Sequence, residues 1–314
     1  MKKISVIIPC FNESLNLIST FHRIKNNVSP ITDNFELIFV DDGSSDESFK
    51  LLFDLSKEYF FVKIIKFSRN FGHQNAIYAG LENSEGDAIF LIDADLQDPP
   101  EIFSEMYKKW ELGYDVVYGK RKSRDGNFIK KFFYNMYHKV FYFLSDLNIS
   151  DDLVDFCLID KKIKNILISL KENNVYFRGL RSWVGFKQIG VNYSRKDRIL
   201  SESKYSFFKL YNLAIDGILN FSLKPLSIIF FLGLLFFFIS LCLIIFFIVQ
   251  KFTGFSFMGV KPEDAKGFFA LVIIILFFSG LNLLALGTIG EYVGRCYKEI
   301  KSRPKFIIDK KINF

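Results

Sequence analysis

Two acidic residues, Asp93 and Asp95, stand two positions apart directly after the apolar run Ala88–Ile92. In an extended chain, residues two apart point to the same side, so both carboxylates would face one space. Paired carboxylate oxygens hold hard divalent cations, and such a cation can neutralise a diphosphate leaving group. The pattern therefore predicts a metal site. The alternative is a solvated acidic turn that caps a helix beginning at Pro99.

A second acidic pair, Asp41 and Asp42, follows the apolar run Phe35–Val40, and Gly43 comes next. A carboxylate at the end of a buried strand can accept hydrogen bonds from a ribose or a base, and the glycine permits a tight turn. Side chains of residues 44–46 could cap the helix that follows. The two interpretations are compatible, and we expect a nucleotide-binding turn that also begins a helix.

A basic group, Arg195, Arg198 and Lys204, precedes a long apolar part of the chain. Arginine can hold a phosphate through two parallel hydrogen bonds, whereas lysine acts as a point charge. The spacing predicts a binding site for a lipid phosphate. The alternative is a solvated loop that touches only lipid headgroups.

Short apolar runs alternate with helical patterns over the first 120 residues, which is typical of a parallel sheet covered by helices. Ligands of such sheets bind beyond the carboxyl ends of the strands, where the acidic pairs stand. The expected strands are Ile4–Ile8, Phe35–Val40, Val62–Phe67, Ala88–Ile92 and Asp115–Tyr118, and the expected helices are Leu15–Ile24, Phe49–Leu55, Gln74–Leu81 and Ile102–Trp110.

Two stretches, Leu226–Val249 and Phe268–Ile289, contain no charged residue. A helix needs about 20 apolar residues to cross a bilayer core, so both are predicted to be transmembrane helices. The alternative, a pair of buried core helices, would normally show a polar face. The segment Phe128–Leu144 has lysines between its aromatic residues, and the segment Tyr205–Phe221 has one apolar helical face. We expect both to be helices that lie in the membrane interface.

The net charge of +7 is gathered in patches, including the end of the chain after the second apolar stretch. Because the loop 250–267 is nearly balanced in charge, the positive-inside bias places both termini in the cytoplasm. Beside two predicted membrane helices, anionic lipid is a better partner for the basic patches than nucleic acid. The four cysteines show no metal or redox spacing, and the amino-terminal apolar run lacks a cleavage site and is interpreted as a strand.

On these motifs the chain resembles glycosyltransferase family 2. Within it, the chain is similar to the bacterial polyprenyl-phosphate (bactoprenol) glucosyltransferases, and the catalytic motifs are shared with dolichol-phosphate mannose synthases. The resemblance extends over nearly the whole chain. It is carried by residues 5–13, Asp42-Gly43-Ser44, Phe67–Gly72, Asp93–Pro99, Asp155-Phe156 with Leu158, Trp183-Val184-Gly185, Ser203-Lys204-Tyr205 and Gly290–Arg295.

The resemblance implies a GT-A fold, a UDP- or GDP-sugar donor, Mg²⁺ or Mn²⁺ as cofactor, and a polyprenyl phosphate acceptor. It implies an inverting transfer with catalytic roles for Asp155 and Asp95, and a metal bound by Asp93, Asp95 and Gln97. The nucleotide-sugar would contact Pro9, Asn12, Glu13, Asp41, Asp42, Asp93 and Ala94. The chain departs from the family pattern at Val154, Cys157 and Ser201, which bears on how phosphate is held and which sugar is used.

The resemblance casts Asp155 as a general base, but the chemistry favours another role. The nucleophile would be a phosphate oxygen, and a phosphate monoester is largely dianionic near pH 7 because its second pKa is about 6. We therefore expect Asp155 to orient a basic side chain or a metal-bound water. The alternative is a turn carboxylate that caps the helix beginning near Lys161.

The predicted protein is an α/β GT-A-type enzyme of the inner membrane, multi-pass, with a mostly parallel, Rossmann-like sheet domain, interfacial amphipathic helices and two C-terminal transmembrane helices. Its predicted parts are a catalytic domain (1–202), a juxtamembrane helix (203–225), a two-helix anchor (226–290) and a basic cytoplasmic tail (291–314). The predicted reaction moves a hexose to undecaprenyl phosphate, as in O-antigen or other surface-polysaccharide modification.

The donor is expected to be UDP-glucose, with GDP-mannose, UDP-galactose and UDP-N-acetylglucosamine as alternatives. A processive polysaccharide synthase is disfavoured because its Gln-x-x-Arg-Trp motif is absent from the sequence. A non-enzymatic nucleotide-sugar binder is disfavoured because the carboxylates are intact. The sequence leaves the oligomeric state open, including a homo-oligomer.

Overall fold

The computed structural model describes residues 2–121, 154–170, 172, 176–194 and 268–314, with single positions between 226 and 252. The chain divides into two compact units, Met1–Gly217 with Ser302–Phe314, and Ile218–Lys301. In the second unit, helix α10 is Phe268–Ile300. Within the described ranges, no helix combines the length and the apolar character needed to cross a bilayer.

Several predictions fall on other parts of the chain. The interfacial segments Phe128–Leu144 and Tyr205–Phe221, most of Leu226–Val249 and the loop 250–267 lie outside the described residues. The interfacial helices and the first membrane helix therefore stay predictions. The second predicted span, Phe268–Ile289, lies within α10, and its crossing of a membrane is not confirmed.

The first unit is built on an eight-stranded sheet in the described part of the chain, with the order β7-β5-β6-β4-β1-β2-β3-β8. Strands β1 to β4 are parallel, and β5 is parallel to β7. Strand β6 runs antiparallel between β4 and β5, and β8 is antiparallel to β3. This mostly parallel α/β sheet confirms the predicted fold of the catalytic domain. The strands are β1 Ile4–Cys10, β2 Phe35–Asp41, β3 Val62–Phe67, β4 Ala88–Leu91, β5 Val116–Arg121, β6 Cys157–Asp160, β7 Gln188–Tyr193 and β8 Ile308–Ile312.

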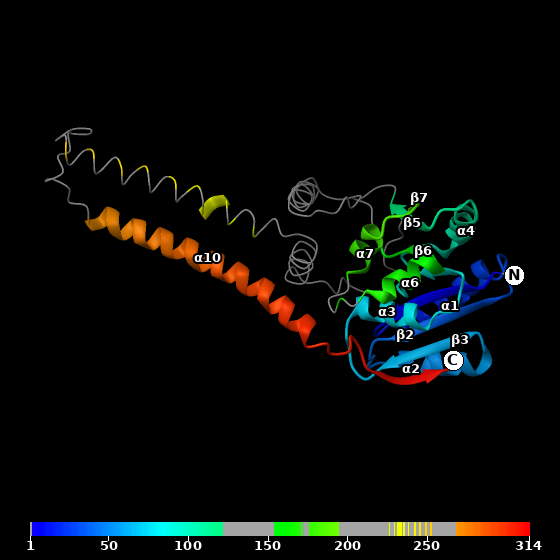
Figure 1. The fold of residues 1–314 in the computed structure, drawn as a ribbon. Helices are drawn as coiled ribbons and strands as arrows, with labels where there is room; N and C mark the ends of the chain where they lie inside the picture. Colours follow the sequence, from blue (N-terminus) through cyan, green and yellow to red (C-terminus); the bar gives the residue numbers. More distant parts are fainter. Residues whose placement is uncertain are drawn as a thin grey trace. The chain divides into compact units, whose positions relative to one another are not determined.

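Helices cover both faces of this sheet (Figure 1). Alternate residues of β1, such as Val6 and Ile8, pack with Phe21 of α1 in one core that also includes residues of α2 and α4. On the other face, Gly80 of α3 lies so close to Ile7 that an added Cβ would be 2.3 Å from its Cγ2. The helices are α1 Leu17–Val28, α2 Ser48–Glu58, α3 His73–Asn83, α4 Phe103–Glu111, α6 Lys161–Ser169 and α7 Phe177–Trp183, with the short 3₁₀ helix η1 Pro100–Ile102.

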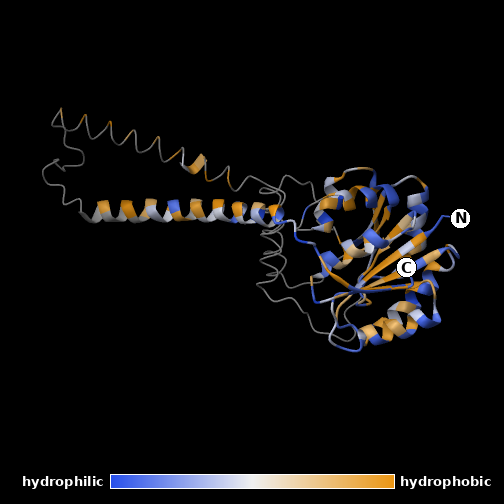
Figure 2. Ribbon diagram, turned by 60° about the horizontal axis from the view of Figure 1, so that its bottom comes forward, coloured by the Kyte–Doolittle hydropathy of each residue, from blue (hydrophilic) through white to orange (hydrophobic). Residues whose placement is uncertain are grey.

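The colouring by hydropathy shows the physical reason for this arrangement (Figure 2). The central strands of the sheet are largely hydrophobic, and the helices beside them combine hydrophobic and hydrophilic residues. All seven residues of β1 are buried, as are six of the seven in β2. Apolar runs without alternation are typical of strands covered on both faces, and the predictions for β1 to β4 are confirmed to within a few residues.

The last strand, β8, belongs to the part of the chain predicted to be a basic tail. It forms the edge of the sheet beside β3, with the carboxyl terminus at its end (Figure 1). Phe306 stacks on Phe67 with ring centroids 5.0 Å apart, and Ser68 donates its N–H to the carbonyl of Ile307 at 3.0 Å. The predicted tail thus contains a structural strand. Its exposed lysines suit an edge strand, since charged side chains there oppose pairing with other chains.

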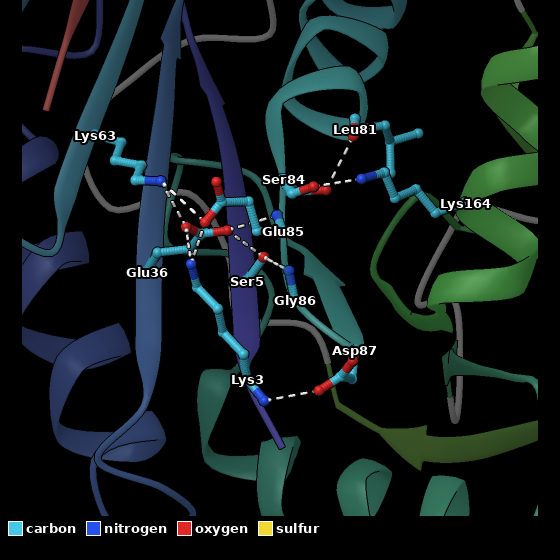
Figure 3. A network of polar contacts seen from close by, with 10 residues as sticks. All are labelled: Lys3, Ser5, Glu36, Lys63, Leu81, Ser84, Glu85, Gly86, Asp87 and Lys164. Carbon is cyan, nitrogen blue, oxygen red and sulfur yellow. Dashed lines mark hydrogen bonds and ion pairs between the residues drawn. The ribbon is translucent and has the colours of Figure 1, made fainter. Parts of the chain in front are cut away.

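A polar network joins the amino ends of the parallel strands, opposite the edge that carries the acidic pairs (Figure 3). Glu36 is 2% exposed, and its Oε2 lies 3.0 Å from Lys3 Nζ and 2.9 Å from Lys63 Nζ. Its Oε1 accepts hydrogen bonds from the Ser5 hydroxyl and from the Glu85 N–H. Burial raises the pKa of Glu36, but these partners outweigh burial and bring the pKa below its ordinary value. The carboxylate therefore ties three strands together.

Candidate active site

The polar turns after β1, β2 and β4 meet at one edge of the sheet. Cys10, the last residue of β1, pairs with Asp41, and Ile92 donates its N–H to the carbonyl of Ile7 at 3.1 Å. The carboxyl ends of these parallel strands are therefore level with one another. This placement confirms that the predicted donor and metal residues lie at the same edge.

The turn after β1 is bound to the turn after β2. Asn12 donates its N–H to Ser44 Oγ at 3.0 Å, and its own Oδ1 accepts the Ser45 N–H at 2.9 Å. Glu13 donates its N–H to Ser48 Oγ at 3.0 Å. Asn12 has φ +53°, a left-handed conformation that asparagine tolerates better than most residues. Pro9 lies within β1, opposite Val40. These contacts give the predicted nucleotide-binding turn a defined shape.

Both carboxylate oxygens of Asp42 accept hydrogen bonds from the backbone of the loop at Phe71 and Gly72. Its Oδ1 accepts the Phe71 N–H at 2.6 Å, and its Oδ2 accepts the Gly72 N–H at 2.9 Å. Gly43, with φ +71°, allows the loop to approach, because an added Cβ would lie 2.5 Å from the Arg69 carbonyl carbon. Burial raises the pKa of Asp42. The predicted contact of Asp42 with the donor stays a prediction.

Asp41 is the more deeply buried member of the pair, with no exposed surface. Its Oδ1 accepts the Ser44 N–H at 3.0 Å, whereas its Oδ2 has no hydrogen-bond partner among the residues that the structure describes. Burial raises the pKa of Asp41. Asp41 therefore lies beneath the surface of the predicted nucleotide site, and its contact with the donor stays a prediction.

Asp93 and Asp95 follow β4 as predicted, and their turn is fastened from α1. Thr20 donates its hydroxyl to the carbonyl of Ala94 at 3.0 Å, and Arg23 Nη1 donates to the carbonyl of Leu96 at 3.3 Å. Leu96 has φ +61°, so this turn is strained and needs such anchors. The short helix η1 has no side-chain capping hydrogen bond at its start. The N-cap position of η1 is occupied by Pro99 and not by one of these carboxylates, and the metal site stays a prediction.

The metal candidates are oxygen donors in a crowded acidic environment. The pKa of Asp93 is raised to about 6, mainly by burial; the charge of His73 opposes this rise, and the carboxylates of Asp98, Asp95 and Asp155 add to it. The backbone N–H of Gln97 donates to Asp95 Oδ1 at 3.2 Å. Over the described ranges, no group of three or more His, Cys, Asp or Glu side chains is arranged to hold a metal ion. Two carboxylates with open positions suit Mg²⁺, which keeps water and substrate phosphates as its other ligands.

Asp155 lies at the same edge, just before β6, and its carboxylate is fully engaged. Arg178 of α7 donates Nε to Oδ1 at 2.9 Å and Nη2 to Oδ2 at 2.8 Å. Gln74 Nε2 donates to Oδ2 at 3.5 Å. Burial raises the pKa of Asp155, but the Arg178 charge and hydrogen bonds outweigh burial and lower it to about 2. Helix α6 is capped by Asp160, which accepts the Lys162 N–H at 2.8 Å, so the capping alternative for Asp155 is wrong.

His73 and Gln74, the first residues of α3, were not predicted to be site residues. His73 Nε2 lies 3.4 Å from Asp93 Oδ1 and 3.8 Å from Asp155 Oδ2, between the two carboxylates. The Gln74 side chain also accepts the Phe177 N–H at 2.9 Å, which joins α3 to α7. Both residues directly follow Phe67–Gly72, one of the stretches that carry the family resemblance, and this position in the sequence could have identified them as site residues.

Arg178 and Arg181 had no signal in the sequence, because their roles depend on packing between distant segments. The basic group predicted for the lipid phosphate, Arg195, Arg198 and Lys204, lies outside the described residues. Its role stays a prediction.

Comparisons with known proteins relate the chain to one family. Residues 5–166 match the profile of Glycosyl transferase family 2. The chain is 44% identical to an uncharacterized glycosyltransferase, YkcC, of Bacillus subtilis strain 168, over 98% of this chain and 93% of the relative. It is 35% identical to the SfII prophage-derived bactoprenol glucosyl transferase of Shigella flexneri, over 98% of each chain. A solved structure of glucosyl-3-phosphoglycerate synthase from Mycobacterium tuberculosis is 16% identical, with a TM-score of 0.44 and coverage of 69% of this chain and 78% of that one.

Proposed function

Because this chain belongs to glycosyl transferase family 2, we propose that it transfers a hexose from a nucleotide-sugar to polyprenyl phosphate. The observation that carries this proposal is the 35% identity, over 98% of both chains, to a bactoprenol glucosyl transferase. The placement of Asp41, Asp93 and Asp155 at one edge of the sheet supports it, since nucleotide, metal and acceptor sites must adjoin. The proposed donor is UDP-glucose.

The proposed step is a single displacement at the anomeric carbon of the sugar. A phosphate oxygen of the lipid forms the new C–O bond with its own electron pair. The bond between the anomeric carbon and the nucleoside diphosphate breaks, and the diphosphate leaves with the electron pair of this broken bond. The configuration inverts, and no proton transfer is required, because the lipid phosphate is largely dianionic near pH 7.

Asp93 and Asp95 are the proposed ligands of a divalent cation, with Gln97 as a further candidate. The raised pKa of Asp93, to about 6, reflects burial and carboxylate repulsion, both of which a bound cation would relieve. When bound, Mg²⁺ or Mn²⁺ neutralises the charge on the leaving diphosphate. The contacts of Thr20 and Arg23 hold the turn that presents these carboxylates.

Asp155 is proposed as a positioning residue rather than a base. A carboxylate with a pKa of about 2 binds protons weakly at neutral pH, and general bases work best when their pKa lies near the operating pH. Both of its oxygens already accept hydrogen bonds from Arg178. These contacts support the interpretation that Asp155 orients a basic side chain.

We also propose that the enzyme acts at the inner face of the cytoplasmic membrane as a multi-pass protein with both termini in the cytoplasm. The support is the pair of uncharged stretches, Leu226–Val249 and Phe268–Ile289, with their asymmetric flanking charge. A polyprenyl acceptor requires access to the bilayer, and nucleotide-sugars are cytoplasmic metabolites.

The test is a transfer assay on membranes that contain the full chain. Undecaprenyl phosphate is added with each of four labelled donors, namely UDP-glucose, UDP-galactose, UDP-N-acetylglucosamine and GDP-mannose, and the lipid extract is examined by mass spectrometry. The expected product is a hexose joined to the lipid through one phosphate, formed from UDP-glucose. Absence of any sugar-linked lipid with all four donors would contradict the proposed function.

A further inference from the structure

We propose that Arg178, backed by Arg181, forms a preorganised phosphate-binding subsite at the catalytic centre, and that Asp155 acts through Arg178. The inference rests on the proposed function, because the phosphoryl group would come from the polyprenyl phosphate or from the nucleotide-sugar. It assigns phosphate binding to Arg178 and Arg181, whereas the sequence analysis predicted it only for the basic group around Arg198.

The first observation is how Arg178 is held. Asp155 takes two of its donors, Nε and Nη2, at 2.9 and 2.8 Å. Gln74 contacts the same carboxylate and accepts the N–H of Phe177, the residue before Arg178. Both the guanidinium and the backbone that carries it are therefore fixed. A planar guanidinium held along one edge presents its other edge in a defined orientation.

The second observation is that the Arg178 side chain is only partly buried. The Arg178 side chain is 36% exposed, whereas Asp155 beneath it is 7% exposed. No hydrogen bond is made by Arg178 Nη1 in the part of the chain that the structure describes. Arginine binds phosphate through two parallel hydrogen bonds, and Nη1 with the second hydrogen of Nη2 provides that pair.

The third observation is a second guanidinium group, that of Arg181, close to Asp155. Arg181 has no exposed surface, and its Nη1 donates to the carbonyl of Val154, next to Asp155. Its Nε and Nη2 have no hydrogen-bond partner within the described ranges. Two guanidinium groups thus stand beside the single carboxylate of Asp155, and the charge of each lowers its pKa. Buried charge is costly unless it is compensated, so a bound anion would stabilise this arrangement.

The position of Arg178 relates the subsite to the reaction. The charges of Asp155 and Asp93 both act on Arg178 and raise its pKa, and His73 lies between these two carboxylates. A phosphoryl group on Arg178 would therefore adjoin the proposed metal ligands. The guanidinium of Arg178 would offset the repulsion between an incoming phosphate and the carboxylates of Asp93 and Asp155.

The test compares Arg178→Lys, Arg178→Gln, Asp155→Asn and the double variant Arg178→Gln/Asp155→Asn in the detergent-solubilised full chain. Michaelis constants are measured for polyprenyl phosphate and for the nucleotide-sugar, together with equilibrium binding of a short-chain polyprenyl phosphate in the absence of donor. Arg303→Lys, a change at an exposed arginine, is the matched control. Thermal midpoints report whether each variant folds.

Arg178→Lys keeps the charge but loses the paired geometry, so the Michaelis constant for one phosphate substrate should rise about tenfold or more. A rise for polyprenyl phosphate, with weaker lipid binding, identifies the acceptor as the source, and a rise for the nucleotide-sugar identifies the donor. The double variant replaces the ion pair by two neutral amides and removes the uncompensated carboxylate. The double variant should stay impaired, because the side chain proposed to bind the phosphate, Arg178, is still missing.

Wild-type constants in the double variant would overturn the proposal, since Arg178 would then serve only to neutralise Asp155. Unchanged constants for both substrates in Arg178→Lys would overturn it as well. Failure of the proposed function has a different signature, because the wild-type chain itself would then transfer no sugar to the lipid.

Discussion

At the scale of single residues, the site carboxylates differ in what engages their oxygens. Asp42 accepts hydrogen bonds from two backbone N–H groups, and Asp155 accepts them from the Arg178 guanidinium, so the carboxylates of both residues position other parts of the protein. Asp93 instead has a His73 nitrogen at 3.4 Å and a pKa raised to about 6 by burial and neighbouring carboxylates. These differences separate residues that shape the site from residues that would hold a cation.

The clearest residue-scale prediction concerns Asp95. Asp95→Asn removes one proposed ligand of the cation that neutralises the leaving diphosphate, and several kcal/mol of transition-state stabilisation should be lost. The rate of transfer should fall on the order of a thousandfold or more. Initial rates with saturating substrates and added Mg²⁺ or Mn²⁺ provide the measurement.

Two controls define this prediction. EDTA should abolish transfer by the wild-type chain, and added metal should restore it. Asp54→Asn, at an exposed acidic position on α2 away from the site turns, should leave the rate unchanged. Full activity of Asp95→Asn in EDTA would show that these carboxylates hold no catalytic metal.

How far the sequence could predict this site depends on the range of the contacts. Asp93 and Asp95 are recognisable because a strand and a two-residue spacing are local features. The partner of Asp155 is not recognisable in this way, because Arg178 lies on α7 and the pair forms only when the folded chain brings α7 to the residues before β6. The role expected for Asp155, orientation of a basic side chain, followed from phosphate chemistry, whereas the identity of that side chain required the structure.

At the scale of secondary-structure elements, the same distinction holds. Strands β1 to β4 were predicted because buried parallel strands are continuous apolar runs. Strand β8 was not, because Asp309, Lys310 and Lys311 are exposed and give the segment the composition of a solvated tail. Its strand character comes from pairing with β3, a partner more than 200 residues earlier in the chain.

The β8 strand should be needed for a stable first unit. Lys310, which pairs with Lys66 of β3, has an exposed side chain, so Lys310→Ala should have little effect. Lys310→Pro removes a backbone N–H and the strand geometry, and each lost hydrogen bond costs about 1 kcal/mol. The thermal midpoint of the full chain should fall in the proline variant only. Equal midpoints for the two variants would show that β8 is dispensable.

The Glu36 network gives a second element-scale prediction. Glu36→Gln leaves Lys3 and Lys63 without their buried partner, and removal of one partner from a buried ion pair costs about 3 kcal/mol. Glu85→Gln is the matched control, since Glu85 is 65% exposed and exposed pairs contribute about 1 kcal/mol or less. Thermal midpoints at pH 7 should fall clearly for the first variant and slightly for the second.

The pH dependence of this effect has a definite sign. The folded-state pKa of Glu36 lies below its ordinary value of 4.5. The stabilisation is therefore present above about pH 4.5 and is lost as the pH falls through the folded-state pKa. The difference in thermal midpoint between wild type and Glu36→Gln should shrink between pH 7 and pH 3. A constant difference over this range would indicate that the charge of Glu36 does not contribute.

At the scale of the whole molecule, the first unit alone carries the donor and metal residues, all at the carboxyl edge of one sheet. The proposed acceptor, by contrast, is a lipid. A catalytic unit that acts on a lipid needs access to the bilayer, and the uncharged stretches Leu226–Val249 and Phe268–Ile289 are the proposed attachment.

The topology of that attachment follows from charge. Only the loop 250–267 should face the outside, because basic residues are concentrated before the first stretch and after the second. With the exposed Cys242 and Cys296 replaced by serine, a cysteine introduced at Ser256 should react with an impermeant thiol reagent in intact cells. A cysteine at Lys301 should react only after the membrane is permeabilised, because the basic residues around it should be retained in the cytoplasm.

The buried Cys10 and Cys157 serve as internal controls that should stay unlabelled in the folded protein. Labelling at position 301 in intact cells would place the catalytic unit outside, away from cytoplasmic nucleotide-sugars, and would contradict both the topology and the proposed site of the reaction.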